Sequence, residues 1–354
     1  MVAAAGAAAG PADSDAGDLI GAVRLELVQP GDSLVAIAGR ERLGFVELVA
    51  ANPWLDPWLP APGALLVLPD AHILPDAPRR GLVVNLGDQR LYHYRPDGRI
   101  GSMAIGIGDE AAATPLGQTR VVRKQARPVW YPPASIRAAD PGLPLSVPPG
   151  PDNPLGSHAL YLGWRGYLIH GTNRPLSIGR ALTHGCIRLY PEDIAQLYAA
   201  VPVGTPVQVV DQPLKAGWQG DRLFLEVHPT AAQAVALETG VPPPAAAVGG
   251  AVLELVAAAS RRRVDAVVDW EAVRRAVAEH RGLPVAIGVS RPAISGDPAI
   301  SGDSGGTPVA PWPPPAPPAP RVRPPVRHPA PPCRRQCAAP TSPLRSRSRG
   351  SPAR

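Results

Sequence analysis

Short apolar runs separated by turn residues dominate the middle of the chain. Each run has the length and the content of Val, Ile, Leu and Tyr that are typical of β-strands. Turn sequences such as Gly87-Asp88 and Pro96-Asp97-Gly98 lie between neighbouring runs. The pattern therefore predicts a mostly β domain over residues 81–212, whose strands are 82–87, 90–94, 101–107, 119–123, 159–163, 166–170 and 206–210.

Two segments have the pattern of helices. Residues 191–201 predict a short helix with Glu192 and Asp193 in its first turn, where carboxylates are favourable. Residues 264–280 have apolar positions at helical spacing and predict an amphipathic helix that packs against the sheet. Its apolar members are Val267, Val268, Trp270, Val273 and Val277. Residues 128–154 are too rich in proline for either element, so we expect a loop at the edge of a cleft.

A smaller α/β module is expected over residues 23–70. Its apolar positions follow the order strand, helix, helix, strand. Asp32 or Ser33 can cap the first helix, and Asn52-Pro53 ends the second. The turn Pro30-Gly31-Asp32 alone fits many linker domains, so the prediction depends on the four elements in their order.

Composition separates the remaining segments from these modules. Residues 1–22 are rich in Ala, Gly and Asp without apolar periodicity, which predicts a disordered N-terminus. Residues 71–80 are a linker interrupted by proline, and residues 213–290 are a C-terminal extension with the expected helix. Residues 291–354 hold 18 Pro and 10 Arg with only two acidic residues, which predicts a disordered tail.

The net charge of +6 comes from this tail. Its ten arginines against Asp297 and Asp303 contribute +8, so the other 290 residues carry −2. The arginines alternate with prolines and do not share an ordered face with aromatic residues, so no nucleic-acid partner is expected. A basic tail can contact anionic polymers or membrane surfaces, and a solvated tail without a partner explains the composition equally well.

One thiol and two imidazoles lie close in sequence, in Ile169-His170-Gly171-Thr172 and in Thr183-His184-Gly185-Cys186-Ile187-Arg188-Leu189. A catalytic cysteine needs an imidazole to take its proton and backbone amides to stabilise the oxyanion. His184 is tethered so closely to Cys186 that good thiol geometry is difficult. His170 ends an apolar run typical of a buried strand, so we assign His170 as the base. The glycine permits a tight turn in which the amides of Gly185 and Cys186 form an oxyanion hole.

These two motifs resemble the signature of the L,D-transpeptidase catalytic domain, also called the YkuD domain. The family's fold implies a β-sandwich with short helices. Segments similar to its opening strands are 82–86, 90–94, 105–108 and 114–117. Segments similar to its enterobacterial branch, whose periplasmic enzymes attach the major outer-membrane lipoprotein to peptidoglycan, are 132–137, 148–156 and 170–175. The module at 23–70 resembles a LysM module, a small fold that binds glycans containing N-acetylglucosamine.

The resemblance implies a role for each site residue. Cys186 is the nucleophile, His170 is the proton donor and acceptor, and His184 supports the site. The expected substrate-binding residues are Arg188, Gly171 and Thr183, of which Arg188 can hold a carboxylate through two parallel hydrogen bonds. The resemblance implies no metal and no cofactor.

The resemblance also implies the reaction. The thiolate attacks the carbonyl of the third residue, a meso-diaminopimelate-type centre, in a donor tetrapeptide of peptidoglycan, and the terminal D-Ala leaves. An amine then resolves the thioester, either the C-terminal Lys of a lipoprotein or the side-chain amine of another stem. Water as acceptor gives an L,D-carboxypeptidase. Carbapenems are expected to acylate such an enzyme.

Other interpretations of the motif are weaker. A zinc site of His158, His170, His184 and Cys186 lacks the paired close spacings of structural zinc ligands. A single free cysteine is usually a small buried hydrophobic residue, but the combined motif disfavours that reading. A non-catalytic wall-binding protein that uses LysM alone has no need of an activated thiol.

The compartment follows from the implied substrate, which lies outside the cytoplasm, so we expect a periplasmic protein. Residues 1–16 lack the basic and Leu-rich segments of a signal peptide, so the true start lies upstream or export follows another route. No apolar segment is long enough to span a membrane. Cys333 and Cys337 lie in the tail, where a local disulfide or none is expected.

Overall fold

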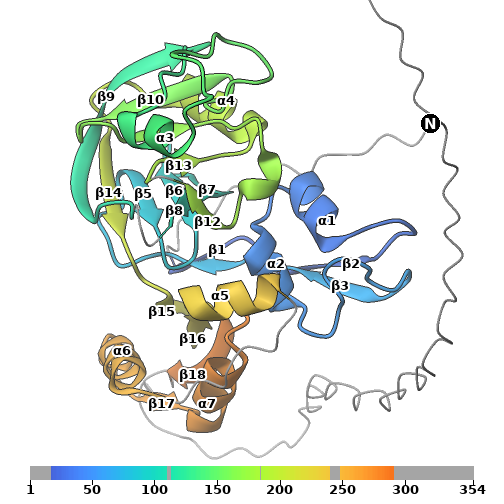
Figure 1. The fold of residues 1–354 in the computed structure, drawn as a ribbon. Helices are drawn as coiled ribbons and strands as arrows, with labels where there is room; N and C mark the ends of the chain where they lie inside the picture. The colour runs from blue at the N-terminus through green and yellow to red at the C-terminus, as the bar shows by residue number, and fades with distance from the viewer. Residues whose placement is uncertain (1–16, 110–112, 184, 240–247, 291–354) are drawn as a thin grey trace, which may run out of the picture. The chain divides into compact units, whose positions relative to one another are not determined.

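The computed structural model of the chain describes residues 17–109, 113–183, 185–239 and 248–290. These residues belong to one compact unit within residues 1–295 (Figure 1). The segment 291–354 and most of the segment 1–22, for which composition predicts disorder, lie outside the described residues.

The N-terminal part contains the predicted order of strand, helix, helix and strand. Its elements are β1 (Leu19–Ile20), β2 (Arg24–Leu27), α1 (Leu34–Glu41), α2 (Phe45–Ala51), β3 (Leu65–Leu68) and β4 (His72–Ile73). Ser33 caps α1, because its hydroxyl accepts a hydrogen bond from the Ala36 amide. The Asn52 side chain follows α2 and bonds both the amide and the carbonyl of Val67. The two helices and β3 therefore share one small core, and β2 pairs with β3 at its edge.

The middle of the chain forms an eight-stranded sheet in the order β13-β11-β10-β9-β14-β5-β6-β7. Its strands are β5 (Gly81–Asn85), β6 (Arg90–Tyr94), β7 (Ile100–Ala104), β9 (Gly117–Ala126), β10 (His158–Leu162), β11 (Leu168–His170), β13 (Ile187–Arg188) and β14 (Pro206–Val210). β8 (Ile107–Gly108) and β12 (Ala181–Thr183) pair with each other outside it. All seven predicted strands are present, although the predicted strand 101–107 is divided between β7 and β8.

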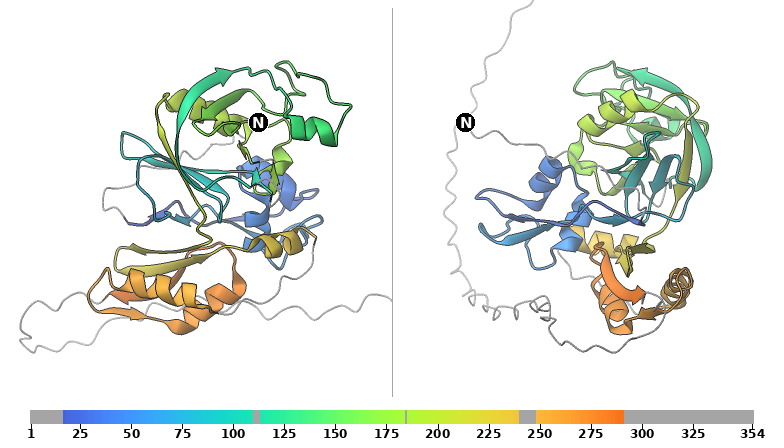
Figure 2. Two further views of the ribbon diagram at one scale, coloured as in Figure 1. Left: turned by 60° about the vertical axis from the view of Figure 1, so that its left-hand side comes forward. Right: turned by 180° about the vertical axis from the view of Figure 1, so that it is seen from behind.

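Strand β9 lets this sheet curl over on itself. Its first residues pair with β14 and its later residues pair with β10. Side chains from β5, β6 and β7 belong to the same hydrophobic core as side chains from β10, β11 and β13. Figure 2 shows the curvature of β9. A mainly β domain is thus confirmed, and the two halves of one curled sheet pack around a shared core.

The helices of this part agree with the prediction only in part. α4 (Pro191–Ala200) coincides with the helix predicted at 191–201. The segment 128–154, predicted to be a loop throughout, contains α3 (Ala134–Ala139) and so needs correction. Pro133 precedes α3, and proline is tolerated at the start of a helix, where its missing amide costs no hydrogen bond.

The C-terminal extension contains a second sheet in the order β15-β16-β18-β17, which the sequence did not predict. Its elements are β15 (Leu214–Gln219), β16 (Arg222–Val227), α5 (Ala231–Glu238), α6 (Gly250–Ser260), β17 (Ala266–Val268), α7 (Trp270–Glu279) and β18 (Val285–Ser290). The single helix predicted over 264–280 is wrong at its start. Val267 and Val268 lie in β17, where β-branched residues are favoured, and Asp269 caps α7. α7 packs against this second sheet through Val273 and Val277.

A buried ionic group joins the two sheets. The Lys215 ammonium of β15 lies 2.6 Å from Asp88 and 3.1 Å from Glu226. Burial alone would raise the pKa of Glu226, but the charge of Lys215 and a hydrogen bond from His228 hold this pKa well below its usual value. Asp88, Glu226 and His228 are close enough to share a cation, and the Lys215 ammonium already supplies that positive charge.

We expect Lys215→Met to lower the free energy of unfolding by about 3–5 kcal/mol, because it leaves two carboxylates buried without their cation. Urea denaturation followed by circular dichroism measures the change. The matched control is Arg274→Met, which removes an exposed pair with Glu271 and should cost less than about 1 kcal/mol. Equal losses in the two variants would contradict a structural role for the buried pair.

Candidate active site

Strands β11 and β13 bring the predicted site residues together. They run parallel, with Ile169 opposite Ile187 and His170 opposite Arg188. Side chains alternate between the faces of a sheet, and Ile169 and Ile187 are buried in the core. His170, Arg188 and Cys186, which precedes β13, therefore lie on the opposite face, which we name the outer face.

Cys186 is diagonal to His170 across these two strands. At the usual sheet spacings of about 4.8 Å between strands and about 3.3 Å per residue, their Cα atoms are about 8 Å apart. The Cys186 thiol donates a hydrogen bond to the Gly166 carbonyl at 3.6 Å, which places the sulfur near the start of β11. In this resting arrangement the thiol is bonded to the Gly166 carbonyl, and the imidazole lies two residues further along the same face of β11.

The His170 imidazole is held in one orientation. It is buried, and its Nδ1 lies 2.6 Å from the carbonyl oxygen of Gly171. A carbonyl oxygen only accepts hydrogen bonds, so Nδ1 carries the proton and Nε2 keeps its lone pair. A side chain on Gly171 would crowd this arrangement, because an added Cβ would lie 3.0 Å from Cγ2 of Ile194. Nε2 is therefore the atom that can take a thiol proton.

The surroundings favour the uncharged form of both groups. Burial raises the pKa of the Cys186 thiol, although a hydrogen bond with the Leu168 backbone and the charge of Arg188 oppose this. Burial and the charge of Arg188 lower the pKa of His170 to about 4, although hydrogen bonds with backbone groups act to raise this pKa. At neutral pH the resting pair is thus a thiol and a neutral imidazole, and proton transfer accompanies the attack.

Two threonines hold the turn that carries Cys186. The Thr183 hydroxyl donates to the Cys186 carbonyl at 2.6 Å, and the Thr114 hydroxyl donates to the Gly185 carbonyl at 3.0 Å. Gly185 has a φ of 91°, in the left-handed region that favours glycine. These contacts fix the orientation of the peptide groups of the turn, and with them the amides expected to form the oxyanion hole.

Arg188 supplies an unneutralised charge on the outer face. Its backbone is fixed by two hydrogen bonds with Gly106, each 2.9 Å long. Its Nε is buried and has no hydrogen-bond partner among the described residues, and no carboxylate of those residues pairs with its guanidinium. Guanidinium groups stay protonated in proteins, so this side chain is available for an anionic ligand.

The residues of the zinc alternative do not converge. His158 belongs to the core face of β10, where its ring contacts Tyr198 at 4.5 Å, whereas His170 lies on the outer face. Among the described residues, the group with the spacing of metal ligands is the one around Glu226. Neither His158 nor His170 belongs to this group. His184, predicted to support the site, lies outside the described residues.

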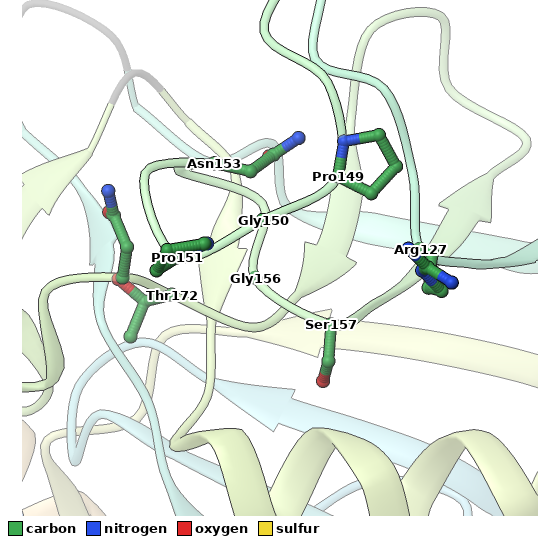
Figure 3. Close-up of a pocket in the computed structure, with 9 residues that line it drawn as sticks. Arg127, Pro149, Gly150, Pro151, Asn153, Gly156, Ser157 and Thr172 are labelled. Atoms are coloured by element: carbon green, nitrogen blue, oxygen red, sulfur yellow. The ribbon is translucent and has the colours of Figure 1, made fainter.

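A cavity of about 330 Å³ opens beside the end of β11 (Figure 3). Its lining residues are Arg127, Pro149, Gly150, Pro151, Asn153, Gly156, Ser157, Thr172 and Asn173. Figure 3 shows Thr172 and Pro151 on one side, and Arg127 and Ser157 on the other. Thr172 follows His170 by two residues, but neither His170 nor Cys186 lines this cavity.

Comparison with known proteins identifies the family of the chain. The family described as the L,D-transpeptidase catalytic domain (YkuD) matches residues 79–209. "Probable L,D-transpeptidase YbiS" of Escherichia coli K12 is 42% identical over 228 residues, which are 62% of this chain and 74% of that protein. "Probable L,D-transpeptidase ErfK/SrfK" of Salmonella typhimurium LT2 is 39% identical over 277 residues, which are 75% of this chain and 85% of that protein. The chain belongs to the L,D-transpeptidase family.

A solved L,D-transpeptidase from Mycobacterium tuberculosis H37Rv is 22% identical, with a TM-score of 0.30, and covers 45% of this chain and 74% of that one. As a member of the family, this L,D-transpeptidase is an acyltransferase. Its described residues contain no helix long and apolar enough to cross a membrane.

The structure gives contacts to two residues of the motif and to one residue outside it. Gly171 and Thr183, which were expected to bind substrate, are buried, and the contacts that the structure gives them are with other residues of the protein. Thr114, in the segment Thr114-Pro115-Leu116-Gly117 that resembles the family, contacts the turn of Gly185. The sequence offered no sign of that contact, because the two residues lie 71 positions apart.

The low pKa of His170 predicts the pH dependence of turnover. Below a pH of about 4 the imidazole is protonated and cannot accept the thiol proton, so kcat/KM should fall there and stay level through the usual histidine range. Arg188→Gln should move this acidic limit upward, because it removes a charge that disfavours the imidazolium. Rates measured in short assays over a pH series test this, and a limit at the usual histidine pKa would contradict it.

Proposed function

We propose that this L,D-transpeptidase acts on peptidoglycan, with Cys186 as the nucleophile and His170 as the proton donor and acceptor. The observation that carries the proposal is the shared outer face of β11 and β13, which holds a thiol, an imidazole whose Nδ1 bonds the Gly171 carbonyl, and the Arg188 guanidinium. A structural cysteine would need none of these neighbours.

The first half-reaction forms a thioester. Nε2 of His170 accepts the Cys186 proton as the sulfur attacks the carbonyl of the third residue in a tetrapeptide stem. The amides of Gly185 and Cys186 donate hydrogen bonds to the oxyanion. The bond to D-Ala then breaks, and the imidazolium returns its proton to the departing amine. The protein is left acylated on sulfur, and free D-Ala is released.

The second half-reaction releases the enzyme. The acceptor amine attacks the thioester carbonyl and loses a proton to Nε2, an amide bond forms, and the Cys186 thiolate regains the proton. The C-terminal Lys of an outer-membrane lipoprotein and the diaminopimelate amine of a second stem both fit this chemistry. Water in the same place gives the alternative, an L,D-carboxypeptidase.

The other residues position these groups. Arg188 binds a carboxylate of the substrate close to the sulfur. Gly171 orients the imidazole through its carbonyl, and Thr183 and Thr114 fix the turn of the oxyanion hole. Direct substrate contacts of Gly171 and Thr183 stay a prediction from the family resemblance. His184 is assigned a supporting role from the family resemblance.

The N-terminal part is proposed to be a LysM module that holds the enzyme on glycan strands. Its order of elements supports this, as do Trp54 and Trp58, which are about half exposed in the loop between α2 and β3. A glycan-binding module beside an acyltransferase site supports one polymer as partner of both, and we propose the periplasm as the compartment. A non-catalytic wall-binding protein would have the module without the site.

The test is mass spectrometry of muropeptides after incubation with the full chain, with and without a lipoprotein that ends in Lys. A gain of a stem-to-stem or lipoprotein amide with loss of D-Ala supports the transpeptidase and identifies the acceptor. Loss of D-Ala alone supports the carboxypeptidase. Intact D-Ala in every sample would overturn the proposal. Sedimentation with sacculi at low and high salt tests the module, because contacts to sugars depend weakly on salt.

A further inference from the structure

Four side chains form a row across the outer face. Cys186 lies beside Leu168 in β11, whose backbone hydrogen bonds with the thiol. Leu168 is paired with Tyr161 in β10, and Tyr161 is paired with Arg123 in β9. Because paired residues point to the same face of a sheet, the row runs from the sulfur across three neighbouring strands to Arg123.

Arg123 is the cationic end of this row. Its guanidinium lies 3.5 Å from the centre of the Tyr161 ring, and the pair is reached by solvent. Strand β9 contains no acidic residue, and no carboxylate of the described residues forms an ion pair with Arg123. An arginine stacked on an aromatic face keeps its N–H edge free for a carboxylate.

The charged residues of this row and of the row that follows it along β11 are arginines. The second row contains Arg188, His170, Ala159 and Gln125. Arg188 lies next to the reacting atoms, and Arg123 lies at the far end of the first row. The outer face thus offers two separate positions for carboxylates, one close to the sulfur and one across the strands.

We propose that Arg123, supported by Tyr161, binds the side-chain carboxylate of the diaminopimelate residue whose carbonyl Cys186 attacks. The inference rests on the proposed function and deepens it by naming the residue that selects the donor. Arg188 is then left for the carboxylate of the departing D-Ala. This carboxylate is close to the bond that breaks, because that bond is to the nitrogen of the same residue.

The distances agree with this assignment. Tyr161 is two strands away from Cys186, which is about 10 Å at the usual strand spacing. In diaminopimelate six carbon–carbon bonds of about 1.5 Å separate the attacked carbonyl from the side-chain carboxylate, which is about 7–8 Å when the chain is extended. A bond to sulfur at one end and a hydrogen bond of about 2.8 Å at the other complete the span.

The test combines protein variants with amidated donors. The donors are a soluble tetrapeptide stem with a free diaminopimelate carboxylate, the same stem amidated at that carboxylate, and the stem amidated at its C-terminal D-Ala. We expect Arg123→Gln to raise KM for the free stem about tenfold with little change in kcat, the size typical of a charge-assisted hydrogen bond. Amidation of the diaminopimelate carboxylate should raise the KM of the wild type similarly and add nothing in Arg123→Gln.

Lys124→Gln is the matched control. Lys124 is the next residue of β9, but it faces the core side, over the Tyr198 ring at 4.4 Å, so its loss removes the same charge away from the outer face. It should leave KM for all donors unchanged. Arg123→Lys should recover part of the affinity, because it keeps the charge without the fork of donors.

Two outcomes would overturn the inference. Arg123→Gln that raises KM equally for the free stem and for the stem amidated at diaminopimelate would assign a structural role. If amidation of the C-terminal D-Ala raised the KM of the wild type but not that of Arg123→Gln, Arg123 would be assigned to the D-Ala carboxylate. Failure of the proposed function is distinct from both, because the wild type would then release no D-Ala from the free stem.

Discussion

Cys186→Ala should abolish acyl transfer, with a fall in kcat of about 10⁴-fold or more, because removal of a covalent nucleophile leaves only binding and oxyanion contacts. The fold should persist, since a small half-buried side chain is exchanged for a smaller one. D-Ala release from a tetrapeptide stem, followed by mass spectrometry, measures the loss. An unchanged thermal midpoint shows that the variant is folded.

The acyl-enzyme gives a direct readout of the same residue. A carbapenem should add one acyl group to the wild type and none to Cys186→Ala, as measured by intact mass. The control is the double variant Cys333→Ala and Cys337→Ala, which removes the tail cysteines and should keep both turnover and the adduct. A Cys186→Ala variant that still forms the adduct, or still releases D-Ala at the wild-type rate, would falsify the nucleophile assignment.

How far the sequence predicts the fold depends on how local the determining signal is. The predicted strands 90–94 and 206–210 coincide with β6 and β14, because the strand-forming residues and the flanking turns are contained within each segment. β15 was missed although it pairs with β16 along its whole length. Its buried Lys215 interrupts the apolar pattern in the sequence. The charges that stabilise this buried lysine, on Asp88 and Glu226, come from other parts of the chain.

The helix predicted over 264–280 was wrong at its start for a different reason. Val267 and Val268 fit a helical apolar face as well as they fit a strand, and only the presence of β18 decides between the two. Asp269 was the local sign of the boundary, because aspartate is a strong N-cap and its carboxylate accepts hydrogen bonds from the amides that follow. Strand pairing over long distances overrides periodicity in short segments.

The candidate site shows the same division. The sequence predicts Cys186 as a nucleophile and His170 as a base, since their residue types carry the chemistry. It could not show that β11 and β13 pair in parallel, which is what places both side chains on the outer face. Arg123 had no signal of its own either, because its position relative to Cys186 follows from the registers of three strand pairs.

His170→Gln should lower kcat/KM by about 10²–10⁴-fold, the usual contribution of a general base. The substitution is well suited to the site, because a glutamine amide can donate to the Gly171 carbonyl in place of Nδ1 but cannot take a proton from the thiol. Turnover should fall while the thermal midpoint stays near that of the wild type. The rate of Cys186 alkylation near neutral pH should fall as well, because the neutral thiol loses its proton acceptor.

The matched control is His158→Gln, which changes a histidine on the core face of β10 and should leave kcat/KM within a few-fold of the wild type. His184→Gln separates the two motif histidines, and a supporting role predicts a smaller loss than that of His170→Gln. If His170→Gln left both turnover and the pH profile of alkylation unchanged while His184→Gln removed them, the base would be His184. The free Nε2 of His170 would then have another use, and the pairing across β11 and β13 would not be the catalytic one.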